Sequence, residues 1–365
     1  MVAGGGLLGG SGAMVRSILA KGVAAAALAA AVMAFPGSGA GQDIRFLRIG
    51  TGSISGVYFP IGGLIASAVS NPPGARACSE GGACGVPGLI AVAQATTGSV
   101  ANVRAIGDGA LETALVQADV AHFAREGMGA FAGGRRIPEL RAIANLYPEA
   151  VHIVVRADSP ITRIEHLSGR RVSLDLAGSG TREVARLVLE GHGIDPASVR
   201  QVNSQLGPAV DRIRLGRIDA FFFVGGFPVG ALAGLAREMP LRLLPISGER
   251  AAAIRRKDPF LTEARIPAQT YHGVAPVDTL AVGALWVVSE KVDAGIVYGI
   301  TQALWHSSTR RLLEQGHPVA RQMRLDNALK GLAIPLHVGA ERYYREEGLI
   351  KDRVPPAAEP RPAGR

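Results

Sequence analysis

Residues 46–60 read FLRIGTGSISGVYFP, and this stretch contains the pattern that decides the fold. The first four residues are a short β-prone run, and the next seven form a loop of Gly, Thr, Ser and Ile. Apolar residues then recur at helical spacing from 61 to 69, and Pro72 ends the predicted helix. A strand, a small-residue loop and a helix therefore follow one another, which is the repeating unit of an α/β fold.

The same unit recurs along the chain. Strands at 89–94 and 172–176 are each followed by a loop and then by a helix, and a strand at 115–117 precedes a helix that we expect Asp119 to cap. The other expected elements are strands at 142–146, 151–155, 219–224, 241–246 and 279–288, and helices at about 293–315 and 321–330. This alternation predicts an α/β fold with mostly parallel sheets, and its two blocks suggest two lobes.

Three of the loops carry polar side chains directly before or within the first turn of a predicted helix. Those side chains are Thr51, Ser53, Ser55 and Tyr58 in the first loop, Ser99 and Asn102 in the second, and Ser179 and Thr181 in the third. Ligands of open α/β sheets bind beyond the carboxyl ends of the strands, and a helix N-terminus offers free N–H groups to an anion. Ser and Thr are also preferred helix caps, so capping is the alternative for each loop taken alone. Three loops at equivalent positions favour a shared anion site.

Signatures of enzyme chemistry are missing from the sequence. There is no P-loop, no Gly-x-Ser-x-Gly elbow and no His-Glu-x-x-His motif, and the loop at 50–56 is one residue too long for a dinucleotide fingerprint. Glu112, Asp119 and Glu149 are the carboxylates nearest the loops in sequence, and a pairing among them in space stays open. An exported hydrolase would need a base beside a loop serine, and no motif supplies one.

The net charge of +9 does not indicate a nucleic-acid partner. A basic balance fits nucleic acid, an anionic membrane or acidic ligands. The arginines are dispersed, and aromatic residues make up only 5% of the chain, so no stacking platform accompanies them. We therefore expect no nucleic-acid binding.

The two ends of the chain are expected to lie outside the fold. Two basic residues precede an apolar run at 23–35 and small residues before Ala40, which predicts a cleaved secretory signal at 1–40 and a periplasmic protein. A membrane anchor is the alternative, but the run is shorter than the roughly 20 residues that span a bilayer. No later segment is expected to span a membrane, and the Pro-rich residues 351–365 are expected to be disordered.

Cys78 and Cys84 are the two cysteines of the chain and share a Gly-rich loop. Export permits a disulfide between them. A metal site is the alternative, but it would need further ligands, and no histidine is near in sequence. We favour a local disulfide, which contributes about 2 kcal/mol for so short a loop.

Taken in order, the segments of this chain resemble the solute receptors of the TAXI subfamily of TRAP transporters. The resemblance covers about residues 44–350. Its segments are IGTGS at 49–53, GVYFP at 56–60, GSVAN at 98–102, QADVA at 117–121, NLYPE at 145–149, LSGRRVS at 167–173, GSGT at 178–181, IDAFF at 218–222, GGFP at 225–228, IPA at 266–268 with Tyr271, and VYGIT at 297–301.

The resemblance implies a type 2 periplasmic-binding-protein fold, in which two crossing strands join two α/β lobes around a ligand cleft. Lobe 1 would combine 41–150 with 265–350, and lobe 2 would comprise 151–264. The implied ligand is a small organic anion, either an amino acid such as glutamate or a dicarboxylate. Clamshell closure would present it to the integral membrane permease subunits of a TRAP transporter. The resemblance implies no catalysis, no cofactor and no metal, and a periplasmic sensor that signals to a receptor is the alternative role.

The resemblance also places individual side chains in the cleft. The implied ligand contacts are Thr51, Ser53, Tyr58, Ser99, Asn102, Ser179 and Thr181, with Gly180 in the third loop and Gln117, Phe223 and Tyr271 as further wall residues. Core packing is the alternative for the last three. Arg182 departs from the apolar residue that the family more often has there, and could either select anions or face water.

Overall fold

Two long strands, β6 (Leu140–Arg156) and β12 (Val277–Ser289), organise the computed structural model, which describes residues 43–351. The first part of β6 pairs with β12, and its last part pairs with β9 (Ala220–Gly225). β12 pairs on its other edge with β5 (Thr113–Gln117). These are the two crossing strands expected of the fold, and the predicted α/β class is confirmed.

The sheet is mixed, so the prediction of a mostly parallel sheet is wrong. Neighbouring strands follow the order β4 (Leu89–Gln94), β1 (Arg45–Gly50), β5, β12, β6, β9, β7 (Arg171–Ser173) and β8 (Arg200–Gln201). Pairing is parallel around β1 and around β7, and antiparallel wherever β6 or β12 takes part. The crossing strands enter the sheet without the crossover helix that a parallel neighbour requires.

Short strands extend these pairings. β10 (Leu241–Leu243) pairs with β6, and β11 (Thr262–Ile266) pairs with β12. β2 (Ser70–Asn71) and β3 (Val86–Pro87) form a separate two-stranded pair.

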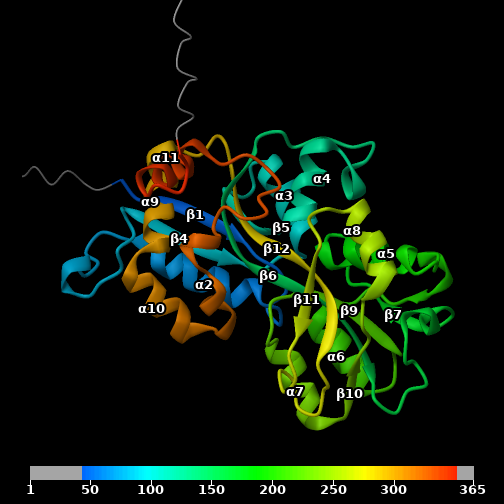
Figure 1. The fold of residues 1–365 in the computed structure, drawn as a ribbon. Helices are drawn as coiled ribbons and strands as arrows, with labels where there is room; N and C mark the ends of the chain where they lie inside the picture. The colour runs from blue at the N-terminus through cyan, green and yellow to red at the C-terminus, as the bar shows by residue number, and fades with distance from the viewer. Residues whose placement is uncertain (1–42, 352–365) are drawn as a thin grey trace, which may run out of the picture. The chain divides into compact units, whose positions relative to one another are not determined.

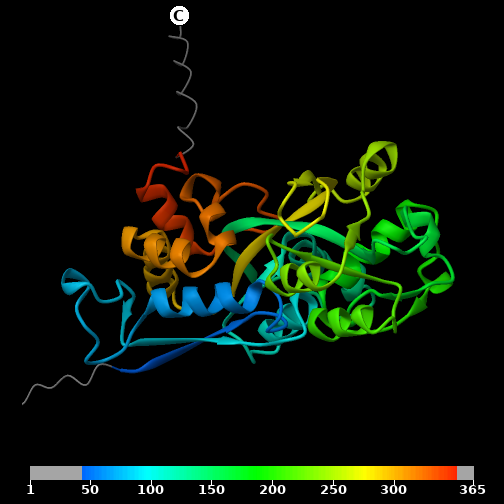
Figure 2. The same ribbon diagram turned by 90° about the horizontal axis from the view of Figure 1, so that it is seen from below.

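Helices cover both faces of the sheet. They are α2 (Tyr58–Val69), α3 (Ser99–Gly107), α4 (Ala118–Glu126), α5 (Gly180–Gly191), α6 (Leu206–Arg214), α7 (Gly230–Glu238), α8 (Gly248–Lys257), α9 (Ala294–Trp305), α10 (Ser307–Gly316) and α11 (Val338–Glu346). In Figure 1, β6 and β12 run between α2 and α9 on one side and α5 on the other. Figure 2 shows α2 lying lengthwise along β1 and β4, which it contacts.

Alternating residues of the central strands enter two separate hydrophobic cores. In β5, Ala114 and Val116 pack in one core and Leu115 packs in the other. Successive strand residues point to opposite faces, so both faces of the sheet are buried. This explains why β5 and β9 are buried at every residue, and why β9 reads as a continuous apolar run.

The strands predicted at 142–146 and 151–155 are one strand, β6, which continues through Pro148. Proline has no N–H for the ladder and is tolerated at irregular positions of a sheet. The register between β6 and β12 shifts next to Pro148, where Ala284 pairs with Tyr147 but Leu285 pairs with Asn145. This irregularity accommodates the proline without ending the strand.

Three helix predictions are also wrong in detail. The helix expected at about 293–315 is interrupted at His306, whose extended backbone (ψ 145°) separates α9 from α10. The helix expected at about 321–330 consists of two 3-10 turns, Pro318–Gln322 and Leu325–Asn327. Asp119 does not cap α4, because Gln117 holds the cap position and Asp119 lies inside the helix.

The described residues from Ile44 onward form one compact unit. The division into lobes at 41–150, 151–264 and 265–350 therefore stays a prediction. The signal at 1–40 and nearly all of the tail at 351–365 lie outside the described residues. Between residues 43 and 351, no helix is both long and apolar enough to cross a bilayer.

Candidate functional site

A cavity lies where the three predicted loops meet. Its polar lining consists of Ser53, Tyr58, Thr97, Ser99, Gln117, Glu149, Asp175, Ser179 and Thr181, and its apolar wall consists of Val57, Leu206, Phe223 and Val224, with Gly52, Gly56, Gly98 and Gly180 between them. Helices α2, α3 and α5 all begin at this cavity. Each contributes unpaired N–H groups and the positive end of a helix dipole.

The second and third loops are in direct contact across the cavity. The Ala101 N–H donates to the Gly178 carbonyl over 3.0 Å. A Cβ on Gly178 would lie 3.0 Å from Thr97, and a Cβ on Gly98 would lie 3.2 Å from the Ser179 Cα. Side chains at Gly98 and Gly178 would crowd the opposite loop, so these two glycines allow the loops to approach each other at the cavity.

The closed cavity is small. It encloses about 50 Å³.

Eight of the predicted ligand contacts line the cavity, and the hydroxyls among them already have structural partners. Those eight are Ser53, Tyr58, Ser99, Gln117, Ser179, Gly180, Thr181 and Phe223. Ser179 Oγ accepts from the Arg182 N–H over 3.2 Å and so caps α5. Ser99 Oγ accepts from the Gln117 N–H over 3.1 Å. The capping alternative is thus correct for Ser179, although its side chain also lines the cavity.

Thr51 and Asn102, two of the predicted contacts, do not line this cavity. Both side chains are fully buried. Thr51 Oγ1 donates to the Gln94 carbonyl over 2.7 Å, and Asn102 Nδ2 donates to the carbonyls of Thr51 and Leu115 over 2.7 and 2.9 Å. These bonds satisfy the carbonyls of Gln94 at the end of β4, of Thr51 just after β1, and of Leu115 within β5. The two residues therefore stabilise the first and second loops through backbone contacts, without lining the cavity.

Ser55 and Tyr271 are the other two predicted contacts outside the cavity. Ser55 lies beside α6, where its Oγ would be 2.7 Å from a Cβ on Gly207. The Tyr271 hydroxyl accepts from the Val229 N–H over 3.2 Å and lies 3.0 Å from His152 Nε2. The core alternative is therefore correct for Tyr271, which packs behind the Phe223 wall with His152.

Two carboxyl groups in the cavity were not among the predicted contacts. Glu149 comes from the interior of β6, and its Oε2 accepts a 2.5 Å hydrogen bond from the Tyr58 hydroxyl. Burial raises the pKa of Glu149 well above its ordinary value, although the bond from Tyr58 lowers it. Asp175 lies in the third loop with a left-handed φ of 72°, and burial raises its pKa to about 6. At neutral pH, Asp175 is therefore largely ionised, and burial favours the neutral form of Glu149.

No basic side chain of residues 43–351 lines this cavity. Arg182, which could have selected anions, turns outward to Asn203 Oδ1 at 2.8 Å and Gln201 Oε1 at 3.1 Å. The helix N-termini supply positive potential at the cavity lining, and the charge of Arg182 reaches Asp175 from outside it, where it lowers the pKa of that carboxyl.

Gln117 has an unsatisfied polar atom beside the cavity. Its side chain is buried, and its Oε1 finds no hydrogen-bond partner among the described residues. A buried amide oxygen without a donor costs about 1–3 kcal/mol. Oε1 is closed off here and packs against Gly180, so a ligand could bond to it only if the side chain or α5 moved.

The other two candidate carboxylates, Glu112 and Asp119, do not line the cavity. Glu112 Oε2 accepts from the Arg48 N–H over 2.8 Å, and the two side chains form an ion pair at the edge of β1. Asp119 is buried in α4 and does not line the cavity. Asp119 nevertheless lies close enough to Glu149 for its charge to raise the pKa of that cavity carboxyl.

Residues 49–348 match the NMT1-like family. The chain belongs to this family. The match runs from the end of β1 through α11, so every element that builds the cavity of this NMT1-like chain lies within it. Membership in the TAXI subfamily stays a prediction.

Solved structures of binding proteins are similar to this NMT1-like chain. The alkanesulfonate-binding protein SsuA from Xanthomonas axonopodis pv. citri, bound to MOPS, is 15% identical, with a TM-score of 0.47 over 83% of this chain and 84% of that one. The periplasmic aliphatic sulphonate binding protein SsuA from Escherichia coli is 13% identical, with a TM-score of 0.41 over 83% of each chain. The substrate binding protein of an amino acid ABC transporter is 13% identical, with a TM-score of 0.42 over 75% of this chain and all of that one (100%).

Proposed function

We propose that this NMT1-like protein is an exported solute-binding protein that captures a small carboxylic acid in the loop cavity and presents it to membrane transport subunits. The observation that carries the proposal is the cavity itself, which three helix N-termini and the unpaired Gln117 Oε1 surround. Helix N-termini bind carboxylates without a basic side chain.

The two carboxyl groups of the cavity favour an amino acid over a dicarboxylate. Asp175 is largely ionised at neutral pH and would repel a second negative charge, but it would attract an ammonium group. Burial raises the pKa of Glu149 and so favours its neutral form, in which the carboxyl group can donate a hydrogen bond to a ligand oxygen without adding negative charge. The proposed pose therefore puts the ligand carboxylate at the starts of α3 and α5 and its ammonium group beside Asp175.

Binding rather than hydrolysis is the role that the serines support. Ser179 Oγ donates to the Leu176 carbonyl over 2.9 Å, and no histidine of residues 43–351 lines the cavity to activate a serine. A nucleophilic serine needs such a base within hydrogen-bond reach.

A thermal-shift screen of the purified protein against amino acids, dicarboxylates and 2-oxo acids tests the proposal. A ligand at one hundred times its Kd stabilises the native state by about 2.7 kcal/mol, which raises Tm by several degrees. We expect amino acids to give the largest shifts. No shift with any of the three classes contradicts the proposed function.

The transport partner is a separate question with its own test. We propose TRAP permease subunits, which the sequence resemblance implies, and a periplasmic location. Uptake of the captured ligand into vesicles that contain the permease should then depend on an ion gradient. Uptake that depends on ATP hydrolysis would assign the protein to an ABC transporter instead.

A further inference from the structure

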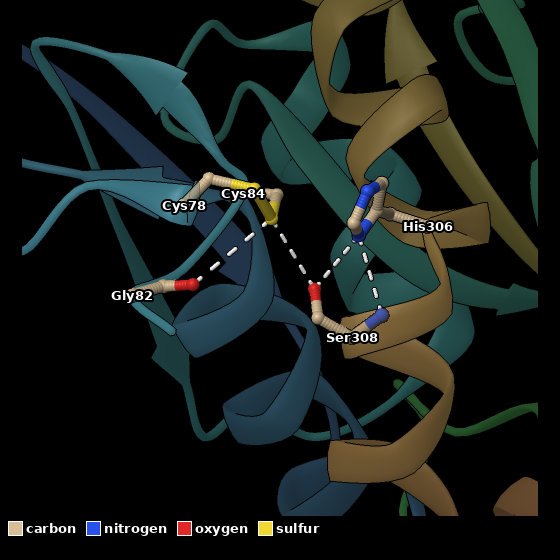
Figure 3. Close-up of a disulfide and its surroundings, with 5 residues drawn as sticks. All are labelled: Cys78, Gly82, Cys84, His306 and Ser308. Carbon is tan, nitrogen blue, oxygen red and sulfur yellow. Dashed lines mark hydrogen bonds between the residues drawn. A yellow bond between two sulfur atoms is a disulfide. The ribbon is translucent and has the colours of Figure 1, made fainter. Parts of the chain in front are cut away.

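The disulfide loop lies against the start of α10, far from it in sequence. Cys78 and Cys84 are disulfide-bonded in the segment between β2 and β3. Ser308, at the start of α10, has its Oγ 3.4 Å from Cys84 Sγ, although the two residues are 224 positions apart. Figure 3 shows the His306 ring next to Ser308 and across from the two sulfur atoms of the disulfide.

Three metal-ligating side chains therefore share one place. One ligand atom from each of Cys78, Cys84 and His306 lies within 4.8 Å of the other two. Two thiolates and an imidazole are a ligand set that zinc accepts with a water in the fourth position. Cys78 and His306 are exposed and Cys84 is partly exposed, so an ion can reach them from solvent.

Hydrogen bonds around His306 suit a ligating imidazole. His306 Nδ1 lies 2.8 Å from Ser308 Oγ, whose hydroxyl points on to Cys84 Sγ. Nδ1 also accepts the Ser308 N–H over 3.2 Å and so caps α10. Ligation through Nε2 moves the imidazole proton to Nδ1, which then gives up this cap and donates to Ser308 Oγ instead. A histidine that ligates zinc is commonly held in this way by a hydrogen bond from its other ring nitrogen.

We propose that Cys78, Cys84 and His306 form a Zn²⁺ site when the disulfide is reduced. A thiol or phosphine reductant supplies two electrons, the S–S bond breaks, and each sulfur takes up one proton. The reductant is oxidised to its disulfide or its phosphine oxide. Zn²⁺ then displaces both thiol protons to the solvent and binds the two thiolates and the imidazole.

The oxidised loop does not bind the ion, because a disulfide sulfur carries no negative charge and thiolate is the form that ligates metals. Reduction without metal frees the loop from its covalent bond, and zinc replaces that bond with a link from the loop to the start of α10. The site is thus gated by redox state. It involves none of the cavity residues, so it stands or falls independently of ligand capture.

The test uses the full chain, purified with its disulfide and divided into an oxidised sample and a phosphine-reduced, oxygen-free sample. Zn²⁺ is titrated into each against a chromophoric chelator. We expect one Zn²⁺ per reduced chain and none per oxidised chain. Co²⁺ in place of zinc should give thiolate-to-cobalt charge-transfer absorption in the reduced sample alone.

His306→Ser separates metal binding from folding, because Ser still caps α10 but removes the imidazole. We expect it to weaken zinc binding at least about 10-fold, the loss seen when even an outer partner of a ligand is removed. His272→Ser, at another exposed histidine, is the matched control and should leave the affinity unchanged. Failure of the reduced chain to bind zinc, equal binding by the oxidised chain, or unchanged affinity in His306→Ser would each overturn the proposal.

Discussion

The Tyr58 hydroxyl at the start of α2 donates a 2.5 Å hydrogen bond to Glu149 Oε2 in β6, 91 residues further along the chain. Both residues are buried and line the cavity. The bond thus fixes the first loop of the cavity to the strand that crosses the sheet.

Removal of the Tyr58 hydroxyl should destabilise the protein. Tyr58→Phe leaves the buried Glu149 without its donor, and such a loss costs about 1–3 kcal/mol. Tyr298→Phe is the matched control, because Tyr298 donates a similar 2.6 Å bond to Glu346 at the surface. Exposed interactions of this kind contribute about 0–1 kcal/mol. Urea unfolding measures both variants, and equal losses would show that Glu149 finds another donor.

Stability should fall as pH rises because Asp119 is buried as a neutral acid. Burial and the nearby Asp258 raise the pKa of Asp119 from 3.8 to about 8. The native state therefore holds a proton between about pH 4 and pH 8 that the unfolded chain has lost, so the free energy of unfolding decreases across that window. Asp119→Asn should make the decrease shallower.

The slope is measured by urea unfolding at several pH values from 4 to 9. Asp43→Asn, at an exposed aspartate, is the control and should retain the wild-type slope. A slope that is the same in Asp119→Asn and in the wild type would mean that Asp119 is ionised in the native protein.

Truncation of Asn102 should lower stability, whereas truncation of Ser53 should lower ligand affinity. Asn102→Ala removes two donors to buried carbonyls, so we expect a loss of about 1–3 kcal/mol in stability. Ser53→Ala removes a half-exposed cavity hydroxyl and should lower ligand affinity with little change in stability. Unfolding and calorimetric titration of both variants distinguish these roles. If Asn102→Ala instead lowers ligand affinity with little change in stability, Asn102 contacts the ligand.

The sequence predicts the loops of the site and names Glu149 as a candidate carboxylate, but it does not predict that Glu149 points into the cavity or that Asp175 joins it. Ser53, Ser99 and Ser179 follow strands in a recognisable strand–loop–helix order, and that order alone brings them to one edge of the sheet. Glu149 lies inside a strand, and its partner in the β12 ladder, Val282, is distant in sequence. Its direction into the cavity depends on the β6 register, which local pattern does not determine.

Side-chain direction limits the prediction in the same way for other residues. Thr51 and Asn102 occupy the predicted loop and helix, yet they turn to strand-end carbonyls that only the folded sheet brings near. His306 joins Cys78 and Cys84 only because α10 packs beside the disulfide loop. Such contacts can be recognised only in the three-dimensional structure, because residue type and spacing do not determine them.

Closure of the cavity should depend on the absence of a side chain at Gly180. A Cβ there would lie 2.1 Å from Gln117 Oε1 and 3.0 Å from Ser99 Oγ, closer than atoms can approach without movement. Gly180→Ala therefore forces either the Gln117 side chain or α5 to move, and both changes alter the cavity lining. We expect ligand affinity to fall at least about 10-fold, which is about 1.4 kcal/mol, and stability to fall by about 1–3 kcal/mol through overpacking.

Gly230→Ala is the matched control for Gly180→Ala. Both glycines are the first residue of a helix, but a Cβ on Gly230 would meet nothing within 4 Å. Since alanine favours helices over glycine, this control should keep its affinity and gain slightly in Tm. The ligand with the largest shift in the thermal screen measures affinity, and urea unfolding measures stability without any ligand. If Gly180→Ala matches Gly230→Ala in both, the contact between α5 and Gln117 does not close the cavity, and the ligand must be held by the first two loops alone.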